Sequence, residues 1–484
     1  MTSATPEGLL AGLKGIARVD GSRLVVTDPA RMRGEAIDGL VDDAVFDADA
    51  AVRDAARWLI WSASQALGCG SASIHELYMA RGRGECPATR FTVPAINVRA
   101  AAYLTARQAF AAALERDAGA VIFEIAKSEM AYTDQRPAEY TAVILAAAIK
   151  SGWVGPVFLQ GDHFQFNATK WQADPGEEMS GLKQLSSEAV AAGFLNIDID
   201  SSTLVDLSQP SVAEQQRVNF ANTVELTALI RSIEPDLVTI SIGGEIGEVG
   251  KANSNEEELR AYLDGYFGTL HGSGLAGISK VSIQTGTSHG GVVLPDGSVA
   301  QVKIDFDTMQ RLSTIARDEY GLAGAVQHGA STLPGEAFRH FPNNGTAEIH
   351  LATGFQNILY DDGGLPDALR GEMMAWCLAS CADERKPGET DEQFLYKTRK
   401  KAIGPFKRGL WTLPPDAQEQ IGANLHTKFG LLFDRLGING TRSLVDQFVS
   451  IPDLPWPLPA SLGGADAGAV VAGASVFEDD GSGE

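Results

Sequence analysis

Eight short runs with the character of β-strands recur through the middle of the chain, and this rhythm constrains the fold more than any other feature of the sequence. They occupy residues 91–98, 120–126, 156–164, 194–202, 237–245, 280–289, 324–331 and 347–354. Helical stretches such as AEYTAVILAAAIKSG and NEEELRAYLDGYFGTL separate most of them. Strands that alternate with helices form right-handed βαβ units, and eight such units close a (β/α)8 TIM barrel. We therefore predict this α/β fold. An open, doubly wound sheet is the alternative, but no GxGxxG motif follows the first run.

The segments on either side of these runs differ from them in composition. Residues 1–75 are rich in Ala and Asp, and 47–68 has the apolar periodicity of an amphipathic helix. We predict an N-terminal helical extension over 1–75, a (β/α)8 barrel catalytic domain over 76–405, and a C-terminal helical segment over 406–462. The Gly/Ala-rich, acidic residues 463–484 predict a disordered tail.

Composition and charge exclude several classes of function. The net charge of −23 argues against nucleic-acid binding, which needs a basic surface, and solubility is the simplest reason for the acidity. An anionic substrate would need a local positive site, such as a metal ion or backbone N–H groups. No run of 18 apolar residues could span a bilayer, and the stretch MTSATPEGLLAGLKG lacks the pattern of a secretion signal. The four cysteines form no paired CxxC array, so we expect reduced thiols in a cytoplasmic protein with no membrane partner.

Polar side chains gather where the predicted strands end, which is where barrel enzymes place their chemistry. In chain order these residues are Asp162, His163, Asp200, Glu245, His289 and His328, with His350 on the last strand. The chain has only eight histidines, and three of them end separate strands. Three imidazoles and a carboxylate around an open position make a catalytic divalent-metal site, most simply for zinc. The alternative for each residue is an ordinary polar side chain at a strand-to-loop junction.

Glycines stand beside two of these histidines. Gly290 follows His289, and Gly329 follows His328. Glycine lets the backbone approach a ligand closely, and its exposed N–H groups can bind an anion such as phosphate. Such turns would let an acidic protein hold a sugar phosphate. The alternative is that both are ordinary turns between a strand and a helix.

Several of these motifs, in this order, resemble those of the class II, metal-dependent fructose-bisphosphate and ketose-bisphosphate aldolases. The resemblance covers residues 75–360 and extends weakly to about 440. It is carried by VPAINV, GDHFQ, GGEIGEVG, QTGTSHGGV and VQHGAS, which are similar to the family's VPAFNV, LDHG, EAELGxxGG, AIGTAHG and VLHGGSG.

The resemblance implies a role for each matching residue. The implied metal ligands are His163, His289 and His328, with Glu245 near the metal and able to serve a second cation site, divalent or monovalent, and Asp200 as the acid that ends strand four. Asp162 is implied to be the catalytic acid/base. The implied substrate-binding residues are Asn97, Ser128, Gly290, Gly329, Ser331 and Thr353. In this mechanism zinc stabilises an enediolate formed by cleavage between C3 and C4 of a ketose phosphate.

The chain departs from the family in the part that would contact substrate. Where the family's eighth strand has NIDTD, this chain has HLATG, so His350 and Ala352 replace Asn and Asp while Thr353 is kept. Gln160 replaces the histidine that precedes LDHG. The loop after the fifth strand has KANSNEEE, with its nearest acid, Glu256, out of register. We expect a retained metal centre and an altered substrate site.

These observations predict a zinc-dependent aldolase that acts on a ketose phosphate, with fructose 1,6-bisphosphate as the default substrate. The family implies a homo-oligomer, a dimer or larger. One alternative is a non-catalytic binding subunit with the same fold. The other is a different metal-dependent barrel enzyme that epimerises or hydrolyses an atypical sugar, with Asp200 and Glu245 able to hold a second metal.

Overall fold

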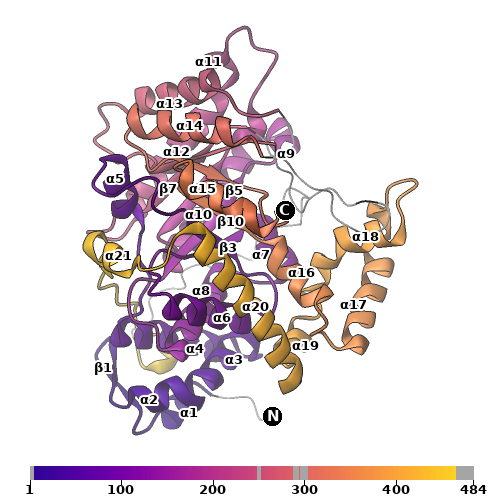
Figure 1. The fold of residues 1–484 in the computed structure, drawn as a ribbon. Helices are drawn as coiled ribbons and strands as arrows, with labels where there is room; N and C mark the ends of the chain where they lie inside the picture. Colours follow the sequence, from indigo (N-terminus) through magenta and orange to yellow (C-terminus); the bar gives the residue numbers. More distant parts are fainter. Residues whose placement is uncertain (1–4, 248–251, 287–293, 295–303, 465–484) are drawn as a thin grey trace.

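A closed barrel of eight parallel strands forms the centre of the molecule (Figure 1). The computed structural model describes residues 5–247, 252–286, 294 and 304–464. The barrel strands are β3 (Val93–Asn97), β4 (Ile122–Ala126), β5 (Phe158–Gln165), β6 (Asn196–Asp200), β7 (Ser241–Glu245), β8 (Lys280–Ile283), β9 (Ala325–Gln327) and β10 (Glu348–Leu351). They follow one another in chain order around the barrel, and β10 closes it by pairing with β3. The predicted (β/α)8 barrel is confirmed, and each predicted run overlaps one strand.

Helices connect successive strands and cover the outside of the barrel. They are α6 (Ala102–Glu115), α7 (Lys127–Thr133), α8 (Pro137–Ser151), α9 (Ala168–Ala173), α10 (Pro175–Ala191), α11 (Val212–Gln215), α12 (Arg217–Ile233), α13 (Glu256–Leu270), α14 (Phe306–Asp318), α15 (His340–Asn343) and α16 (Thr353–Asp361). Local sequence sets where several of them begin. Asn255 and Glu258 form a capping box at the start of α13. At the start of α10, Asp174 accepts two backbone hydrogen bonds, and Pro175 occupies the first helical position.

The N-terminal extension packs against one side of the barrel and includes a hairpin that was not predicted. It contains α1 (Pro6–Gly12), β1 (Ala17–Asp20), β2 (Arg23–Val26), α2 (Pro29–Arg31), α3 (Ile37–Phe46), α4 (Ala50–Leu67) and α5 (His75–Gly82). The predicted amphipathic helix over 47–68 is α4, whose buried face includes Trp58 and Trp61. The ring of Trp61 stacks on Trp456 at a centroid distance of 4.2 Å, which joins the extension to the C-terminal segment.

The chain between α4 and α5 closes the end of the barrel where the strands begin. The Ala72 N–H donates to the Val157 carbonyl at 3.0 Å, and the Ile74 N–H donates to Asn196 Oδ1 at 2.9 Å. From α5, the hydroxyl of Tyr78 donates to the Glu348 carboxylate inside the barrel. This end is therefore filled by the protein's own chain, and the opposite end, where the strands finish, is left for chemistry.

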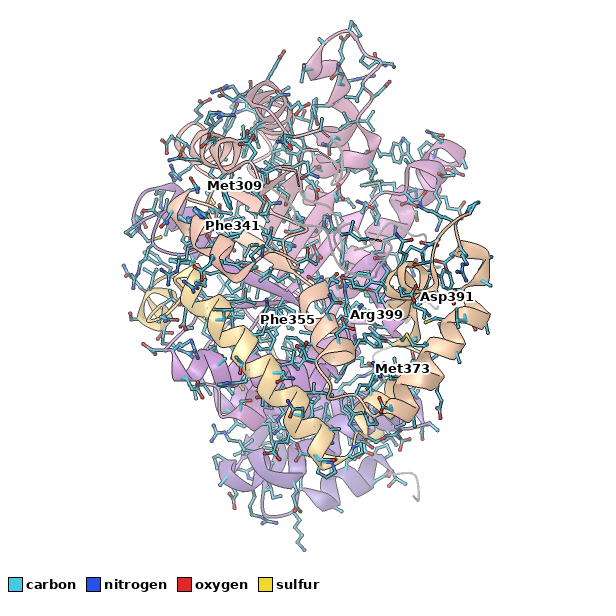
Figure 2. The ribbon with its side chains drawn as sticks, turned by 45° about the vertical axis from the view of Figure 1, so that its right-hand side comes forward. Met309, Phe341, Phe355, Met373, Asp391 and Arg399 are labelled. Carbon is cyan, nitrogen blue, oxygen red and sulfur yellow. The ribbon has the colours of Figure 1, made fainter. Side chains whose placement is uncertain are left out.

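The C-terminal helices lie beside the barrel. They are α17 (Asp367–Ser380), α18 (Asp391–Thr398), α19 (Lys407–Trp411), α20 (Pro415–Leu436) and α21 (Arg442–Phe448). Figure 2 shows Met373, Asp391 and Arg399 together in the lobe made by α17 and α18. Arg399 pairs with Asp361 of α16 at 2.6 Å and so ties this lobe to the barrel. Among the described residues no helix has both the length and the apolar character needed to cross a membrane. Residues 465–484, nearly all of the predicted tail, lie outside the described residues.

Candidate metal centre and catalytic site

A bulge in β5 turns two adjacent side chains toward the barrel interior. Successive residues of a regular strand point to opposite faces, so Asp162 and His163 could not both face inward. The pairing of β5 with β6 shifts register between Gly161 and Phe164, and His163 has φ +41°, in the left-handed region. An extra residue at a bulge re-aims its neighbours in this way. Because such a backbone costs about 1–3 kcal/mol in a residue other than glycine, the surrounding structure must hold it in place.

His163, Glu245 and His328, which we call the metal group, meet at the ends of β5, β7 and β9. His163 Nδ1 lies 3.1 Å from Glu245 Oε2, and His328 Nε2 lies 4.0 Å from the same oxygen. The two imidazole rings are 4.0 Å apart between centroids, and all three residues are buried. Ligands held 2.0–2.2 Å from one tetrahedral zinc ion lie roughly 3.3–3.6 Å from one another. The two separations lie on either side of this range, and one ligand atom from each residue lies within 4.8 Å of the others, so these nitrogen and oxygen donors could hold a divalent cation.

The electrostatic surroundings of the metal group favour a cation. Burial and the neighbouring Asp200 raise the pKa of Glu245 to about 7, although His163 opposes the shift. Burial would lower the pKa of His163, but Asp162 and Glu245 outweigh it and raise that pKa well above the usual value. The site is therefore rich in negative charge and attracts either protons or a metal ion.

Asp200 lies against the metal group and is engaged by other partners. Its Oδ2 is 3.2 Å from His163 Nδ1 and also accepts a hydrogen bond from Gln165. Its Oδ1 accepts hydrogen bonds from the Ser202 backbone N–H at 2.9 Å and from the Ser202 hydroxyl at 2.7 Å. With both oxygens occupied, Asp200 is arranged to orient the ring of His163, which is how carboxylates commonly support a metal-binding histidine.

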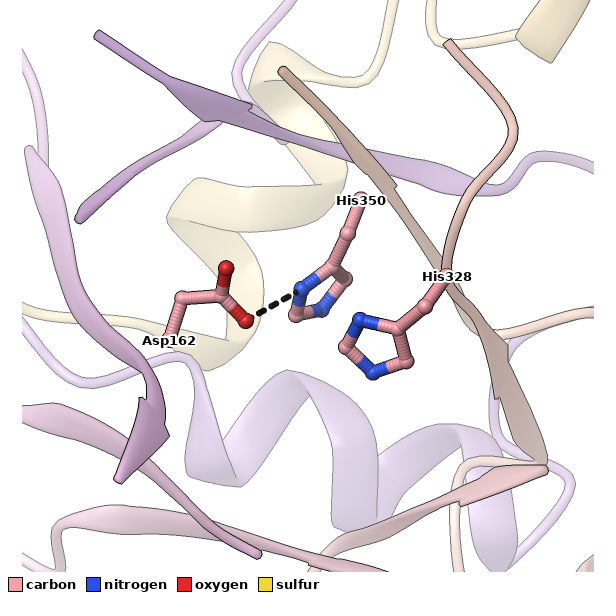
Figure 3. A group of neighbouring side chains, drawn as sticks. All are labelled: Asp162, His328 and His350. Atoms are coloured by element: carbon pink, nitrogen blue, oxygen red, sulfur yellow. Dashed lines mark hydrogen bonds and ion pairs between the residues drawn. The ribbon is translucent and has the colours of Figure 1, made fainter. Parts of the chain in front are cut away.

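His350 joins the cluster of imidazoles, but both of its ring nitrogens face carboxylates. Its ring lies 4.0 Å from that of His328 (Figure 3). Nδ1 lies 2.9 Å from Asp162 Oδ1 and 3.2 Å from Glu124 Oε1, and Nε2 lies 2.7 Å from Glu348 Oε1. Burial would lower the pKa of His350, but these carboxylates raise it well above the usual value. Both ring nitrogens of His350 are already paired with carboxylates, so of the groups that contain His328 the metal group is the better fit.

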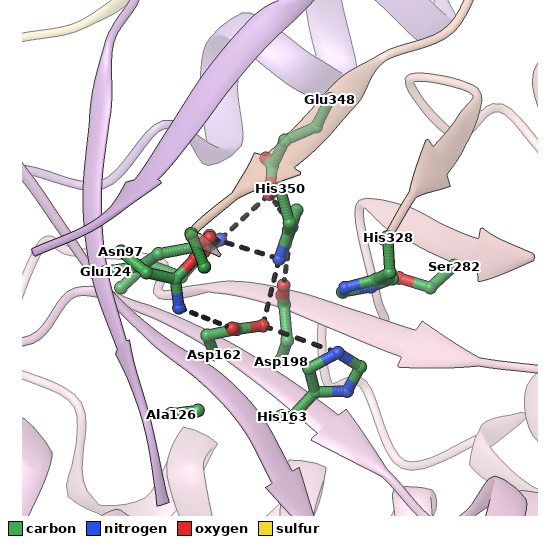
Figure 4. A network of polar contacts seen from close by, with 12 residues as sticks. Asn97, Glu124, Ala126, Asp162, His163, Asp198, Ser282, His328, Glu348 and His350 are labelled. Atoms are coloured by element: carbon green, nitrogen blue, oxygen red, sulfur yellow. Dashed lines mark hydrogen bonds and ion pairs between the residues drawn. The ribbon is translucent and has the colours of Figure 1, made fainter. Parts of the chain in front are cut away.

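Asp162 is held in its ionised form beside the metal group. Its Oδ1 accepts the hydrogen bond from His350, and its Oδ2 accepts one from Asn97 Nδ2 at 2.8 Å (Figure 4). Burial would raise its pKa, but His163 and His350 outweigh burial and lower it. Asp162 is therefore a fixed carboxylate base whose Oδ1 lies 3.8 Å from His163 Nε2.

Beneath Asp162 the barrel interior contains a group of buried polar side chains that sequence reasoning missed. We call this group the polar core; its members are Glu124, Gln160, Asp198, Lys280 and Glu348. Lys280 Nζ donates to Gln160 Oε1 at 2.8 Å, to Asp198 Oδ2 at 2.9 Å and to Glu348. Gln160 Nε2 donates to Glu124 at 2.7 Å and to Glu348 at 2.8 Å. Charged residues inside otherwise apolar strands were the available signal, since barrel interiors are usually packed with branched aliphatic side chains.

The predicted substrate-binding residues lie at the ends of several strands. Asn97 ends β3 and contacts Asp162, whereas Ser128 lies in the first turn of α7, two residues beyond β4. Ser331 Oγ accepts the Ala352 N–H at 2.6 Å, which joins the ends of β9 and β10. Beside them, Thr353 Oγ1 lies 3.4 Å from Arg99 Nη1.

The other predicted residues at this end of the barrel are Gly329, His289 and Gly290. Gly329 has φ +67°, which a glycine adopts without strain. His289 and Gly290 lie outside the described residues. The third predicted imidazole ligand and one of the predicted phosphate contacts therefore stay predictions.

Comparison with known proteins links the chain to a family. A model of the family described as fructose-bisphosphate aldolase class-II matches residues 84–400, more than half of the chain. No curated protein matches the chain. Among solved structures, a fructose-bisphosphate aldolase from Campylobacter jejuni is 16% identical with a TM-score of 0.44, covering 75% of this chain and 93% of its own.

Two further solved structures carry other descriptions. A probable tagatose 6 phosphate kinase from Sinorhizobium meliloti is 18% identical with a TM-score of 0.50, covering 77% of this chain and 96% of its own. The fructuronate-tagaturonate epimerase UxaE from Cohnella laeviribosi is 12% identical with a TM-score of 0.46, covering 72% of this chain and 82% of its own. At these identities the likeness concerns the fold, and the choice among activities depends on the site.

Proposed function

Because the chain belongs to the class II fructose-bisphosphate aldolase family, we propose that it is a metal-dependent aldolase that cleaves and forms the C3–C4 bond of a ketose phosphate. One observation carries the proposal. The buried metal group of His163, Glu245 and His328 lies directly beside Asp162, a carboxylate that is held ionised by two hydrogen bonds.

The metal group would hold a divalent cation, most simply zinc, with His289 as the third imidazole. When bound, the cation supplies Lewis-acid stabilisation of the negative charge that develops on the ketose oxygens. Asp200 orients the ring of His163 through the 3.2 Å contact between its Oδ2 and His163 Nδ1. Glu245 Oε2 lies between the two imidazoles, where it would complete the donor set or serve a second, divalent or monovalent cation.

Asp162 provides the proton transfer that the reaction needs. In the cleavage direction it accepts the proton of the C4 hydroxyl as the C3–C4 bond breaks, and it returns that proton when the bond forms. Its lowered pKa keeps it ionised and ready to act as a base at neutral pH. Asn97 Nδ2 donates a hydrogen bond to Oδ2, and His350 holds Oδ1. Because each oxygen has a partner, rotation of the carboxylate is restricted.

The ends of β9 and β10 are proposed to hold the phosphate. Gly329 forms a turn with positive φ, and the Ser331 hydroxyl accepts a hydrogen bond from the Ala352 N–H. Thr353 is the first residue of α16. A helix that begins in this way offers unpaired N–H groups to an anion. Gly290 is a further candidate, and Asn97 and Ser128 would face the sugar. Fructose 1,6-bisphosphate is the default substrate, although this chain has Ala352 at the position in the substrate-binding part of the site where the family has an aspartate.

The test combines metal content with product analysis on the same sample. Purified protein is assayed against a panel of ketose mono- and bisphosphates, with and without a chelator, and the products are identified by NMR. We expect release of a triose that stops on chelation and returns with zinc. A matched pair of variants, His328→Ala and the partly exposed His426→Ala, separates loss of the metal from loss of any histidine. Cleavage that survives complete metal removal would overturn the proposal.

The same assay distinguishes the alternatives. A sugar converted to its epimer without free triose would indicate an epimerase, and phosphate or a shortened acid would indicate a hydrolase. Protein with no bound metal and no turnover would indicate a binding subunit. We also infer from the family a homo-oligomer, a dimer or larger, in the cytoplasm, which sedimentation and cell fractionation would test.

A further inference from the structure

His350 connects the candidate base to the interior of the barrel. It belongs to β10, whereas Asp162 belongs to β5, three strands away around the barrel. Its side chain crosses the barrel interior and places Nδ1 2.9 Å from Asp162 Oδ1. The side chain of His350 is fully buried, so this contact is shielded from water.

The opposite edge of the same ring is anchored on the polar core. Nε2 of His350 lies 2.7 Å from Glu348 Oε1. Glu348 in turn accepts hydrogen bonds from the Tyr78 hydroxyl, from Lys280 and from Gln160. These donors come from α5, β8 and β5, so Glu348 is held from three directions and cannot shift without breaking a buried contact.

We propose that His350 is a positioning residue for Asp162: its Nδ1 edge holds the carboxylate aimed at the metal group, and its Nε2 edge fixes the ring on Glu348. The proposal rests on the function proposed above, since it assigns Asp162 the proton transfer. His350 touches neither the substrate nor the metal in this assignment and acts only through Asp162. If the contact with His350 is removed, the hydrogen bond from Asn97 remains. The Asp162 carboxylate can then rotate about that one bond.

The two edges of the ring can be tested separately by substitution. In His350→Asn the amide nitrogen takes the place of Nδ1, so the contact with Asp162 is kept and the contact with Glu348 is lost. In His350→Gln the amide nitrogen reaches the place of Nε2, so the contact with Glu348 is kept and that with Asp162 is lost. Both variants remove the same positive charge, which makes each a control for the other. Ser241→Ala, which removes a 2.8 Å buried hydrogen bond to Ser279 at the beginnings of β7 and β8, controls for any lost buried contact.

We expect an ordering of kcat with little change in KM. A misplacement of a reacting group by about 1 Å costs on the order of 100-fold in rate, so His350→Gln should lower kcat about 100-fold. His350→Asn should lower it by less than about tenfold on the same reasoning, and Ser241→Ala should leave it unchanged. Bound metal, measured in every sample, should stay the same. Equal kcat losses in the Asn and Gln variants, or a loss that follows metal content, would overturn the proposal.

A structural readout keeps this inference separate from the proposed activity. If the wild type shows no metal-dependent turnover, the proposed function fails, and crystal structures of the two variants decide the positioning role. Asp162 should keep its rotamer in His350→Asn and turn away in His350→Gln; an unchanged Asp162 in both would overturn the role. If the single variants do not fold, each substitution is combined with Glu348→Gln. This second change removes one buried carboxylate and so offsets the loss of the imidazolium. The same ordering of kcat is expected in the two double variants.

Discussion

Replacing Lys280 with methionine should destabilise the protein strongly, because this residue is the ammonium at the centre of the polar core. Its side chain is 1% exposed, and Nζ contacts Gln160, Asp198 and Glu348. Methionine fills a similar volume but removes the ammonium from both carboxylates and leaves only the His350 ring as a cation beside them. Removing one partner of a buried ion pair typically costs about 3–5 kcal/mol. The pKa of Glu348 supports this size: burial would raise it, but Lys280 and His350 lower it from 4.5 to about 2. This difference corresponds to about 3 kcal/mol, which Lys280 and His350 supply together.

The pH dependence of the loss gives a sharper test than its size. Because the pKa of Glu348 is lowered in the folded protein, its contribution to stability is present above its ordinary pKa of 4.5 and is lost as the pH falls toward 2. In Lys280→Met burial is no longer opposed by the ammonium, so the folded variant takes up a proton on acidification that the wild type does not. The difference in stability should therefore be largest near pH 8 and smaller near pH 5.

Urea unfolding followed by far-UV circular dichroism at both pH values measures this difference. The control is Lys183→Met, which breaks a 2.6 Å pair with Glu225 in which both side chains are at least 40% exposed. An exposed pair contributes less than about 1 kcal/mol, so the control should change little. A loss in Lys280→Met below about 1 kcal/mol at pH 8, or one that grows at pH 5, would refute the assigned role of Lys280.

Three further predictions concern the metal group and the bulge that supports it. His328→Ala should reduce bound metal to near zero while the circular dichroism spectrum stays that of the folded protein; loss of the fold would indicate a structural role. Adding zinc to metal-free protein at 100 times its Kd should stabilise it by about 2.7 kcal/mol, seen as a higher Tm; an unchanged Tm would count against a metal centre. In Gly161→Ala the new methyl group would lie 2.5 Å from the Phe164 ring. Overpacking of this kind should cost about 1–3 kcal/mol and weaken metal binding, whereas Gly39→Ala in α3, with no atom within 4 Å, should cost nothing.

The barrel could be predicted because its signal is local and repeated. Each strand is a short apolar run, each connection contains a periodic helix, and the number of units fixes the closure. The hairpin of β1 and β2 was missed because its strands are only four residues long and include Arg18, Asp20 and Arg23 in an otherwise helical segment. Such a pattern has too few apolar positions to show a period of two.

The candidate site was predictable in its residue types and only in part in its geometry. Strand ends converge in any closed barrel, so His163, Glu245 and His328 were expected to meet, and the structure brings them together. The bulge at Asp162 and His163 depends on a register shift between β5 and β6, which no short stretch of sequence reveals. It explains why an acid and an imidazole can stand side by side in one strand and both face inward.

The role of His350 shows where motif comparison stops. Position by position, it is a departure from the family pattern, in the half of the site expected to bind substrate. In three dimensions His350 contacts Asp162 of β5, which lies 188 positions away in the sequence. It also contacts Glu348 of its own strand β10, which lies two positions away. Lys280 and Glu348 were missed for the same reason, because a charge inside one apolar strand gains its meaning only from a partner on another strand.

The distribution of charge inside the barrel explains how an altered eighth strand can coexist with a retained metal group. Beneath Asp162 the carboxylates share two resident cations, Lys280 and His350, which belong to the chain itself. The metal group and the adjacent Asp200 include no lysine or arginine, so this part depends on protons or an exchangeable cation to balance its carboxylates. Metal removal should therefore stop the chemistry and leave the barrel folded. His350 is paired with the polar core through Glu348 and with the candidate base Asp162. We therefore expect a change at His350 to alter the proposed reaction without altering bound metal.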